Sequence, residues 1–372
     1  MQKTNKTVTG SVYYAGFDPG SGNATLHVVP MDDVEMGQNI FTIPSIIADV
    51  DVSKILDRGD VDTTLAKVLR SNEYVVTMSD GSSYALHDLA VKEGRNATDA
   101  LGAADRYWSN HSRVLLLALA CMLIPERSFE LRLVTALPVS LYTKENRKRV
   151  KEEMEGYYRF SFSTRGCDYK DREVYVKVGY VGMEGQGILV HDGGQTGMQA
   201  VVDIGERTTD IVTADGQQLL TNRCKGDEIG VGQVVDDLNS YAHTFGRRLS
   251  TNMAHEVLRA YTHGKSLPQI VSDKGILPES GMRDVIDKSI KKVGRSLNML
   301  ISAALNAEGA NVASDYDMIY LAGGGAHYFE DMVKTLVGRV ARIPDPELAN
   351  ARGYADLATS LEGVRSNIWE MD

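Results

Sequence analysis

Two short apolar runs flank a tight glycine turn close to residue 20. Residues 13–18 (YYAGFD) and 24–30 (ATLHVVP) are short and rich in β-branched or aromatic side chains, and PGSGN separates them. Such a pattern predicts two strands joined by a hairpin turn. A third apolar stretch, FTIPSIIADV at 41–50, follows them. The pattern therefore predicts a β-meander.

The same order of elements recurs at residues 200–220 (AVVDIGERTTDIVTADGQQLL): a buried strand that ends in Asp, a glycine, polar residues and a return strand. A repeat at this distance predicts two similar domains and not a solenoid. The length of 372 residues also exceeds the ~250 to 300 at which single cores stop growing. The expected division is a disordered tail at 1–11, a first domain at 12–199 joined by a C-terminal helix at 355–372, and a second domain at 200–354.

Helical patterns alternate with the strands. The apolar run 114–124 is far shorter than the ~20 residues that span a bilayer, and it predicts a buried helix. Apolar residues at steps of three and four between Met282 and Leu305 predict a long amphipathic helix, which leads into a strand and GGG at 317–325. Further elements are expected as a strand at 130–140, a charged helix from Lys144, and helices at 327–340 and 347–363. This alternation favours the α/β class.

Composition and charge exclude several classes of function. With 43% hydrophobic and 24% charged residues the chain is ordinary for a globular protein. A net charge of −10 opposes direct binding to nucleic acid, so a nucleic acid partner is expected only through an adaptor. The basic cluster at 144–151 is interleaved with glutamates, and the i,i+4 spacing of Glu145 and Arg149 predicts an ion pair on a solvated helix face.

The cysteines and the first residues predict a cytoplasmic protein with no membrane partner. Cys121, Cys167 and Cys224 lie far apart and form neither a CxxC motif nor a zinc-binding pattern. MQKTNKTVTG is polar and lacks the apolar core of a signal peptide.

Chemistry is concentrated at three glycine-rich turns. The first hairpin ends a strand with Asp18 and continues through Gly20, Ser21, Gly22 and Asn23, small residues whose backbone N–H groups can approach an anion closely. A carboxylate beside phosphates is favourable only with a cation between them, and Mg²⁺ is the natural one. Taken alone, such a hairpin is more often a plain turn.

The second hairpin repeats the carboxylate and glycine with Asp203 and Gly205, and adds the hydroxyls of Thr208 and Thr209. We expect the two Asp-ended hairpins to face each other across a cleft and to hold one metal-bound nucleotide. The third turn, Gly323-Gly324-Gly325, follows a strand and opens a helix, a place that suits a base, ribose or phosphate. The simpler alternative is a strand-to-helix turn that needs positive φ.

The order hairpin, hairpin, strand-GGG-helix resembles the superfamily of actin, sugar kinases and Hsp-type chaperones. Within it the chain looks most similar to bacterial and archaeal actin-like proteins of the ParM/StbA plasmid-segregation type. The resemblance rests on FDPGSGN, ALGAADRYWSNHSRVLLLAL, TALPVSLY, VVDIGERTTDIV, GDEIGVGQVVDDL, YLAGGGAHYF and PDPELANARGYADLA. It implies an α/β actin-like ATPase fold of two similar domains, each a mixed sheet flanked by helices, around a nucleotide cleft.

The resemblance also implies roles for the residues of the three turns. Asp18 and Asp203 would hold Mg²⁺ through its waters. The segment 226–232, which includes Gly230, would border the ribose and base, and Gly323, Gly324 and Gly325 would border the adenosine. Contacts to the phosphates would come from Gly20, Ser21, Gly22, Asn23, Gly205, Thr208 and Thr209.

Hydrolysis of ATP to ADP would need a residue that orients water, and in the family it precedes the second hairpin. Glu184 is the first choice here and Gln186 the second; the alternative is a polar hinge loop with neither in reach. Relatives carry a phosphate-binding Lys where this chain has Thr25, and Arg207 is a candidate replacement.

The expected activity is that of a filament-forming, cytomotive ATPase whose subunits associate head to tail and reach DNA through an adaptor. GTP is a possible substrate beside ATP. A small-molecule kinase of the same superfamily, with a substrate-binding block hidden in residues 50–110, and a chaperone-type ATPase are the alternatives.

Overall fold

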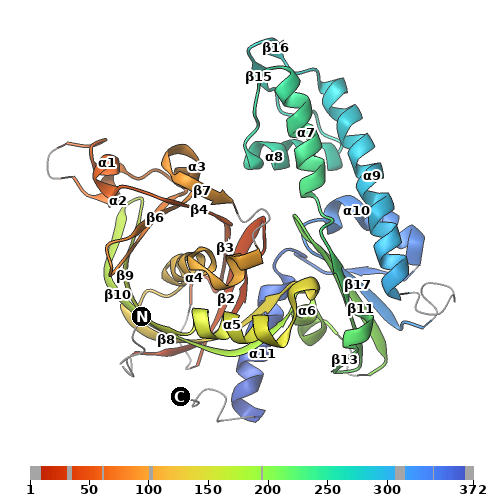
Figure 1. Cartoon of the computed structure of the whole chain (residues 1–372), viewed down its shortest axis with the longest axis horizontal. Helices are drawn as coiled ribbons and strands as arrows, with labels where there is room; N and C mark the ends of the chain where they lie inside the picture. The colour runs from red at the N-terminus through yellow and green to blue at the C-terminus, as the bar shows by residue number, and fades with distance from the viewer. Residues whose placement is uncertain are drawn as a thin grey trace. The chain divides into compact units, whose positions relative to one another are not determined.

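The computed structural model describes residues 10–31, 36–60, 63–99, 104–193, 196–305, 315–337 and 339–364. Two compact units make up the chain: residues 1–191 together with 350–372, and residues 192–349 (Figure 1). Our expected domain borders lay at 199/200 and 354/355. Most of the expected tail at 1–11, and residues 365–372 of the expected C-terminal helix, lie outside the described residues.

A ten-stranded mixed sheet forms the first unit. The predicted hairpin and meander at its start are confirmed: β1 (Val12–Asp18), β2 (Asn23–Pro30) and β3 (Ile40–Pro44) pair antiparallel in sequence order. On the other side of β1, strands β8 (Ser128–Leu137) and β10 (Cys167–Met183) continue the sheet in parallel. The sheet is completed by β9 (Gly156–Thr164), β5 (Glu73–Met78), β6 (Ser83–His87), β4 (Ile46–Asp49) and β7 (Arg95–Asp99), in that order.

This sheet curls around one helix, α4 (Asn110–Leu123) (Figure 1). Residues 114–121 of α4 are all buried in the main core of the unit, as expected for a helix that is apolar on every side. The side chain of Ser109 caps its first turn by accepting from the His111 N–H, and Pro125 follows its end. The buried helix predicted at 114–124 is confirmed.

The residues between 50 and 110, where a kinase-type insertion was considered, belong in their described part to the same sheet. They form β5, β6 and β7, the helices α1 (Val52–Leu56), α2 (Leu65–Val68) and α3 (Asp88–Glu93), and the 3₁₀ turn η1 (Ala104–Trp108). Their described residues thus extend the ten-stranded sheet and form no separate block.

Other helices pack outside the curled sheet. Helix α11 (Ala349–Val364) lies on the outer face of β1 and β8, where Tyr354 and Ala358 meet Tyr14, Val134 and Ala136. The approach is so close that a Cβ at Gly16 would overlap the carbonyl oxygen of Ala351. Two shorter elements, η2 (Val139–Leu141) and α6 (Gln186–His191), follow the ends of β8 and β10.

Helix α5 (Lys144–Met154) carries the basic cluster. Its recorded i,i+4 ion pairs are Lys148–Glu152 and Lys151–Glu155. The predicted pair between Glu145 and Arg149 is wrong, because the Arg149 guanidinium lies 4.9 Å from the centre of the Trp108 ring instead.

The second unit contains a six-stranded sheet with helices packed on it. Its strands are β11 (Met198–Ile204), β12 (Thr209–Asp215), β13 (Gln218–Leu219), β14 (Lys225–Asp227), β17 (Met318–Ala322) and β18 (Ala341–Arg342). Its helices are α7 (Gly232–Thr244), α8 (Thr251–Thr262), the predicted long helix α9 (Glu279–Leu305) and α10 (Ala326–Val337). A turn η3 (Thr221–Arg223) and a small hairpin of β15 (Val271–Ser272) and β16 (Gly275–Ile276) complete the unit.

Each unit repeats one local arrangement. In the first, the β1–β2 hairpin has the parallel strand β8 beside β1; in the second, the β11–β12 hairpin has the parallel strand β17 beside β11. Both units mix strands with helices, so the α/β class is confirmed. Among the described residues, no helix combines the length and the apolar character needed to cross a bilayer.

Candidate functional site

The first hairpin belongs to the first unit and is braced from the next strands of the meander. Asp18 ends β1, and the Ser45 hydroxyl and backbone N–H donate to the carbonyl oxygens of Gly20 (2.5 Å) and Gly22 (3.0 Å). A Cβ at Gly20 would lie 2.5 Å from the Asn23 carbonyl oxygen, so a side chain there would displace the turn. Ser45 thus fixes the loop from a position 25 residues away in sequence.

Thr25, at the position where relatives carry a Lys, lies directly opposite Asp18 in the β1–β2 register. Its side chain is buried and shares a hydrogen bond of 3.0 Å with the hydroxyl of Thr42. No positive charge comes from this position. Arg207, the candidate replacement, already forms an ion pair with Asp236 (2.6 Å). Asp236 therefore partly neutralises the positive charge that Arg207 could offer to a phosphate.

The second hairpin, in the second unit, places two carboxylates opposite each other. Asp203 on β11 and Asp210 on β12 are register partners, and their exposed fractions are 8% and 2%. Like charges at directly opposite positions of a strand pair repel each other, so a cation bound there would stabilise the hairpin. Sequence reasoning missed Asp210, although a four-residue turn at 205–208 would have placed it opposite Asp203.

The two threonines of this hairpin have different surroundings. Thr209, expected to contact phosphate, is fully buried and donates its hydroxyl to the Ile229 carbonyl oxygen (2.7 Å). Thr208 is only half-buried, and its carbonyl oxygen accepts from the Gly205 N–H (2.8 Å), which closes the turn. Of the two hydroxyls, that of Thr208 is the one placed to reach a ligand.

The glycine-rich turn at 323–325 packs directly against the end of β11. Gly323 has φ of +75°, and a Cβ there would collide with the Ile204 carbonyl oxygen and with Asp203 Oδ1. Gly325 donates its N–H to the same carbonyl oxygen (2.8 Å), and a Cβ there would strike the Ile204 side chain. Gly324 has no heavy atom within 4 Å of a Cβ position. The fold itself requires glycine at 323 and 325, and Gly324 faces open space.

The segment 226–232 meets the same hairpin from another direction. The N–H groups of Val231 and Gly232 donate to the carbonyl oxygens of Gly205 (3.1 Å) and Glu206 (2.7 Å). A Cβ at Gly230 would overlap the carbonyl oxygen of Glu206. Three segments predicted from the sequence therefore converge in the second unit, and they present closely packed backbone beside two buried carboxylates.

Glu184 follows the end of β10 in the first unit and is buried, with an exposed fraction of 7%. Its Oε1 atom accepts a hydrogen bond from the Tyr107 hydroxyl (3.0 Å). Helix α11 fixes the loop on both sides: Tyr354 donates its hydroxyl to the Met183 carbonyl oxygen, and Asn350 accepts from the Gly185 N–H, each at 3.0 Å. The backbone around Glu184 is thus held in place by α11.

Gln186 uses its side chain differently. Its Oε1 atom accepts from the Met183 N–H and from the Tyr180 hydroxyl, both at 3.2 Å, so the side chain folds back from the start of α6 toward the end of β10. The side-chain oxygens of both candidates are thus engaged within the first unit, that of Glu184 by Tyr107 and that of Gln186 by Met183 and Tyr180.

His111 lies in the first turn of α4, near Arg106 and Ser45, and sequence reasoning assigned it no role. Burial lowers its pKa to about 4, the positive charge of Arg106 adds to this shift, and the nearby backbone of Ser45 opposes it. No motif surrounds His111, so only its position in the fold identifies it.

We expect the stability of the protein to fall as the pH falls from about 6.5 to about 4. The folded state keeps His111 neutral in this range, whereas the unfolded chain binds a proton, so acid favours unfolding. The loss should be on the order of 2 to 3 kcal/mol between pH 7.5 and pH 4.5. Urea unfolding of wild type and His111→Gln at pH 7.5 and pH 4.5 measures this loss of stability. If stability depends on pH equally in the two proteins, the prediction is wrong.

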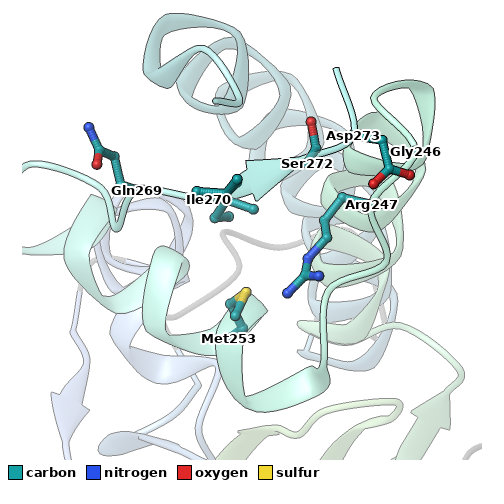
Figure 2. Close-up of a pocket in the computed structure, with 8 residues that line it drawn as sticks. Gly246, Arg247, Met253, Gln269, Ile270, Ser272 and Asp273 are labelled. Atoms are coloured by element: carbon teal, nitrogen blue, oxygen red, sulfur yellow. The ribbon is translucent and has the colours of Figure 1, made fainter. Parts of the chain in front are cut away.

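A pocket of about 470 Å³ lies elsewhere in the second unit, between the start of α8 and the β15–β16 hairpin. Figure 2 shows the side chains of Arg247 and Met253 turned toward one another across it. None of the residues predicted for the site lines this pocket. Within the described residues, no group of three or more His, Cys, Asp or Glu side chains is arranged to hold a metal ion.

Two mixed sheets, each built on an Asp-ended hairpin with a parallel strand beside it, give the fold of actin-like ATPases. An archaeal actin homologue superposes with a TM-score of 0.68 at 18% identity, over 94% of this chain and 99% of that chain. A crystal structure of that homologue in complex with ADP gives 0.67 at 17% identity, with the same coverage. A 15-stranded ParM filament from Clostridium botulinum gives 0.68 at 16% identity, over 94% of this chain and 100% of that chain.

Family models agree with the superpositions. Residues 22–187 match the N-terminal domain of actin-like proteins, and residues 201–335 match the C-terminal domain of the archaeal MreB-like actin homologues. No curated protein sequence matches with significance. Together the two matches span most of the chain and place it among the actin-like proteins, and its fold is similar to that of ParM.

Proposed function

We propose that this protein binds ATP, with GTP as a possible alternative, hydrolyses it, and assembles into filaments in a way that depends on the nucleotide. The observation that carries nucleotide binding is the convergence of residues 203–208, 229–232 and 323–325 in the second unit. Glycines at these contacts let the three backbone segments approach one another closely beside the two buried carboxylates, an arrangement in which no large side chain would block phosphate or ribose. The ADP complex of the archaeal homologue supports the same assignment.

Mg²⁺ fits the residues of the second hairpin. The paired carboxylates of Asp203 and Asp210 are hard oxygen ligands, and their mutual repulsion would be relieved by a divalent cation. Asp18, at the end of β1 in the first unit, would supply a further carboxylate, as in the pattern of the actin-like family. A bound Mg²⁺ would neutralise charge on the β and γ phosphates, a contribution that Thr25 cannot make in place of the usual Lys.

The phosphate contacts would come from both hairpins. Ser21, Gly22 and Asn23 would act in the first unit, and Gly205 and Thr208 in the second; Gly230 and Gly324 would border the ribose and the base. Glu184 would orient the water that attacks the γ phosphate. Its buried carboxylate and its fixed backbone suit a positioning role.

Filament formation is supported by the ParM filament among the structural neighbours. Head-to-tail contacts between identical subunits give an open filament when their rotation does not close. We further propose a cytomotive role in the cytoplasm, such as the segregation of a plasmid, with DNA bound by an adaptor. The negative charge of the chain favours an adaptor over direct contact with DNA.

Pelleting and light scattering of the purified chain test assembly. We expect polymer at roughly micromolar to tens of micromolar protein with Mg-ATP or Mg-GTP, and none without nucleotide or with excess chelator, because bound nucleotide shifts the subunit toward the state that associates. Phosphate release is followed in the same samples. A protein that never assembles, and instead transfers phosphate to an added sugar or acid, would be a small-molecule kinase and would refute the filament proposal.

A further inference from the structure

A buried chain of hydrogen bonds joins Arg106 to Glu184 in the first unit. An Arg106 guanidinium N–H donates to the Tyr107 hydroxyl, and this hydroxyl donates to Glu184 Oε1 (3.0 Å). The exposed fractions of Arg106, Tyr107 and Glu184 are 6%, 3% and 7%. Tyr107 therefore connects a buried cation to a buried carboxylate through one oxygen atom.

The positive charge of Arg106 strengthens the hydrogen bond from Tyr107 to Glu184. A buried charge is costly unless it is paired, and within the described residues Arg106 forms no ion pair with any carboxylate. It is linked to the Glu184 carboxylate through the Tyr107 hydroxyl, and the Tyr107 ring also lies 4.2 Å from the guanidinium carbon. A hydroxyl that accepts from a cation becomes a stronger donor, which tightens its bond to the carboxylate.

The turn that carries this pair is itself anchored. The Arg106 carbonyl oxygen accepts from the hydroxyls of Ser112 (2.7 Å) and Ser109 (3.3 Å), so η1 is fixed to the first turn of α4. Helix α4 is enclosed by the sheet and cannot shift without disturbing the core. The position of the Tyr107 hydroxyl is thus set by the core of the unit.

We propose that Arg106 and Tyr107 are positioning residues for hydrolysis: together they hold the Glu184 carboxylate in the orientation in which it directs the attacking water. This inference rests on the proposed role of Glu184. Tyr107 and Arg106 act on the reaction through Glu184. Removal of the Tyr107 hydroxyl takes away one of the contacts that orient the Glu184 carboxylate.

Tyr107→Phe is the test, because it removes one oxygen atom and keeps the ring. We expect the turnover number to fall by at least ~10-fold, since hydrogen bonds to charged groups are the strong ones. The dissociation constant for ATP, measured with a fluorescent analogue, should change by less than ~2-fold, because the bond orients the water and does not bind the ligand.

A double-mutant cycle separates positioning from a general loss of structure. In a Glu184→Ala background, single-turnover hydrolysis should be the same with and without Tyr107→Phe, because the hydroxyl then has no carboxylate to orient. An additional loss in that background, or wild-type turnover in Tyr107→Phe itself, overturns the proposal. If Glu184→Ala alone hydrolyses ATP at the wild-type rate, the proposed role of Glu184 itself is wrong. This outcome is distinguishable from a failure of the positioning role alone.

Tyr158→Phe is the matched control. Tyr158 is equally buried, has Arg113 over its ring at 5.8 Å, and donates its hydroxyl to the Met154 carbonyl oxygen (2.8 Å), with no recorded bond to Glu184. It should lose similar stability and keep full turnover. If Tyr107→Phe does not fold, Arg106→Lys is measured in its place. It should lower turnover with unchanged ATP affinity, and wild-type turnover in it overturns the proposal.

Discussion

Replacing Glu184 with alanine is expected to lower ATP turnover by at least ~10²-fold while nucleotide affinity stays close to that of wild type. The side chain would act only on the attacking water, so its loss should appear in the turnover number and not in binding. The main chain of the loop should remain in place, because Tyr354 and Asn350 hold it through backbone atoms of Met183 and Gly185.

Gln186→Ala is the comparison that decides between the two candidates. Its side-chain oxygen is occupied by the Met183 N–H and the Tyr180 hydroxyl, so we expect a loss of about 1 kcal/mol in stability and a small change in turnover. Phosphate release in single-turnover experiments measures both variants. Wild-type turnover in Glu184→Ala, with a large loss in Gln186→Ala, would reverse the assignment.

Gly323→Ala is expected to destabilise the protein by roughly 3 kcal/mol and to impair nucleotide binding. Two costs combine here. The φ of +75° strains any residue with a Cβ, and that Cβ would collide with the Ile204 carbonyl oxygen and the Asp203 carboxylate. Because Asp203 is a proposed Mg²⁺ site, its displacement links the loss of stability to a loss of metal-dependent ATP affinity.

Gly324→Ala provides the control one residue away. No heavy atom lies within 4 Å of a Cβ at Gly324, so the free energy of unfolding should change by less than about 0.5 kcal/mol. Weaker nucleotide binding in this variant alone would report a ligand contact at Gly324. Denaturant unfolding and ATP titration are the measurements. Equal stability of the two variants would contradict the geometry of the turn.

The sequence predicted those parts of the fold that depend on local patterns. The two Asp-ended hairpins, the buried helix at 114–124, the long helix α9 and the positive φ of the GGG turn follow from short-range periodicity and from glycine. Each of these features is fixed by neighbouring residues of the chain, so a single sequence is enough to find them.

Contacts between distant residues were not predictable in this way. Ser45 supports a loop 25 residues before it, and Tyr107 reaches Glu184 across 77 residues. The burial of Thr209 depends on its bond to Ile229, 20 residues later. The error at Glu145 and Arg149 has the same cause, because the ring of Trp108 competes for the guanidinium. Helical spacing alone contains no information about such partners.

The enclosure of α4 affects how the protein is made. The sheet order places β8, β10 and β9 between the half that contains β1–β3 and the half that contains β4–β7. All three of these strands follow α4 in sequence. No hydrogen-bonded strands therefore join the two halves of the sheet until the chain up to residue 183 has left the ribosome. Strands β2, β3, β4 and β5, which contact α4, precede it in sequence, so until then the apolar helix is only partly covered and the nascent chain is exposed to aggregation and to capture by chaperones.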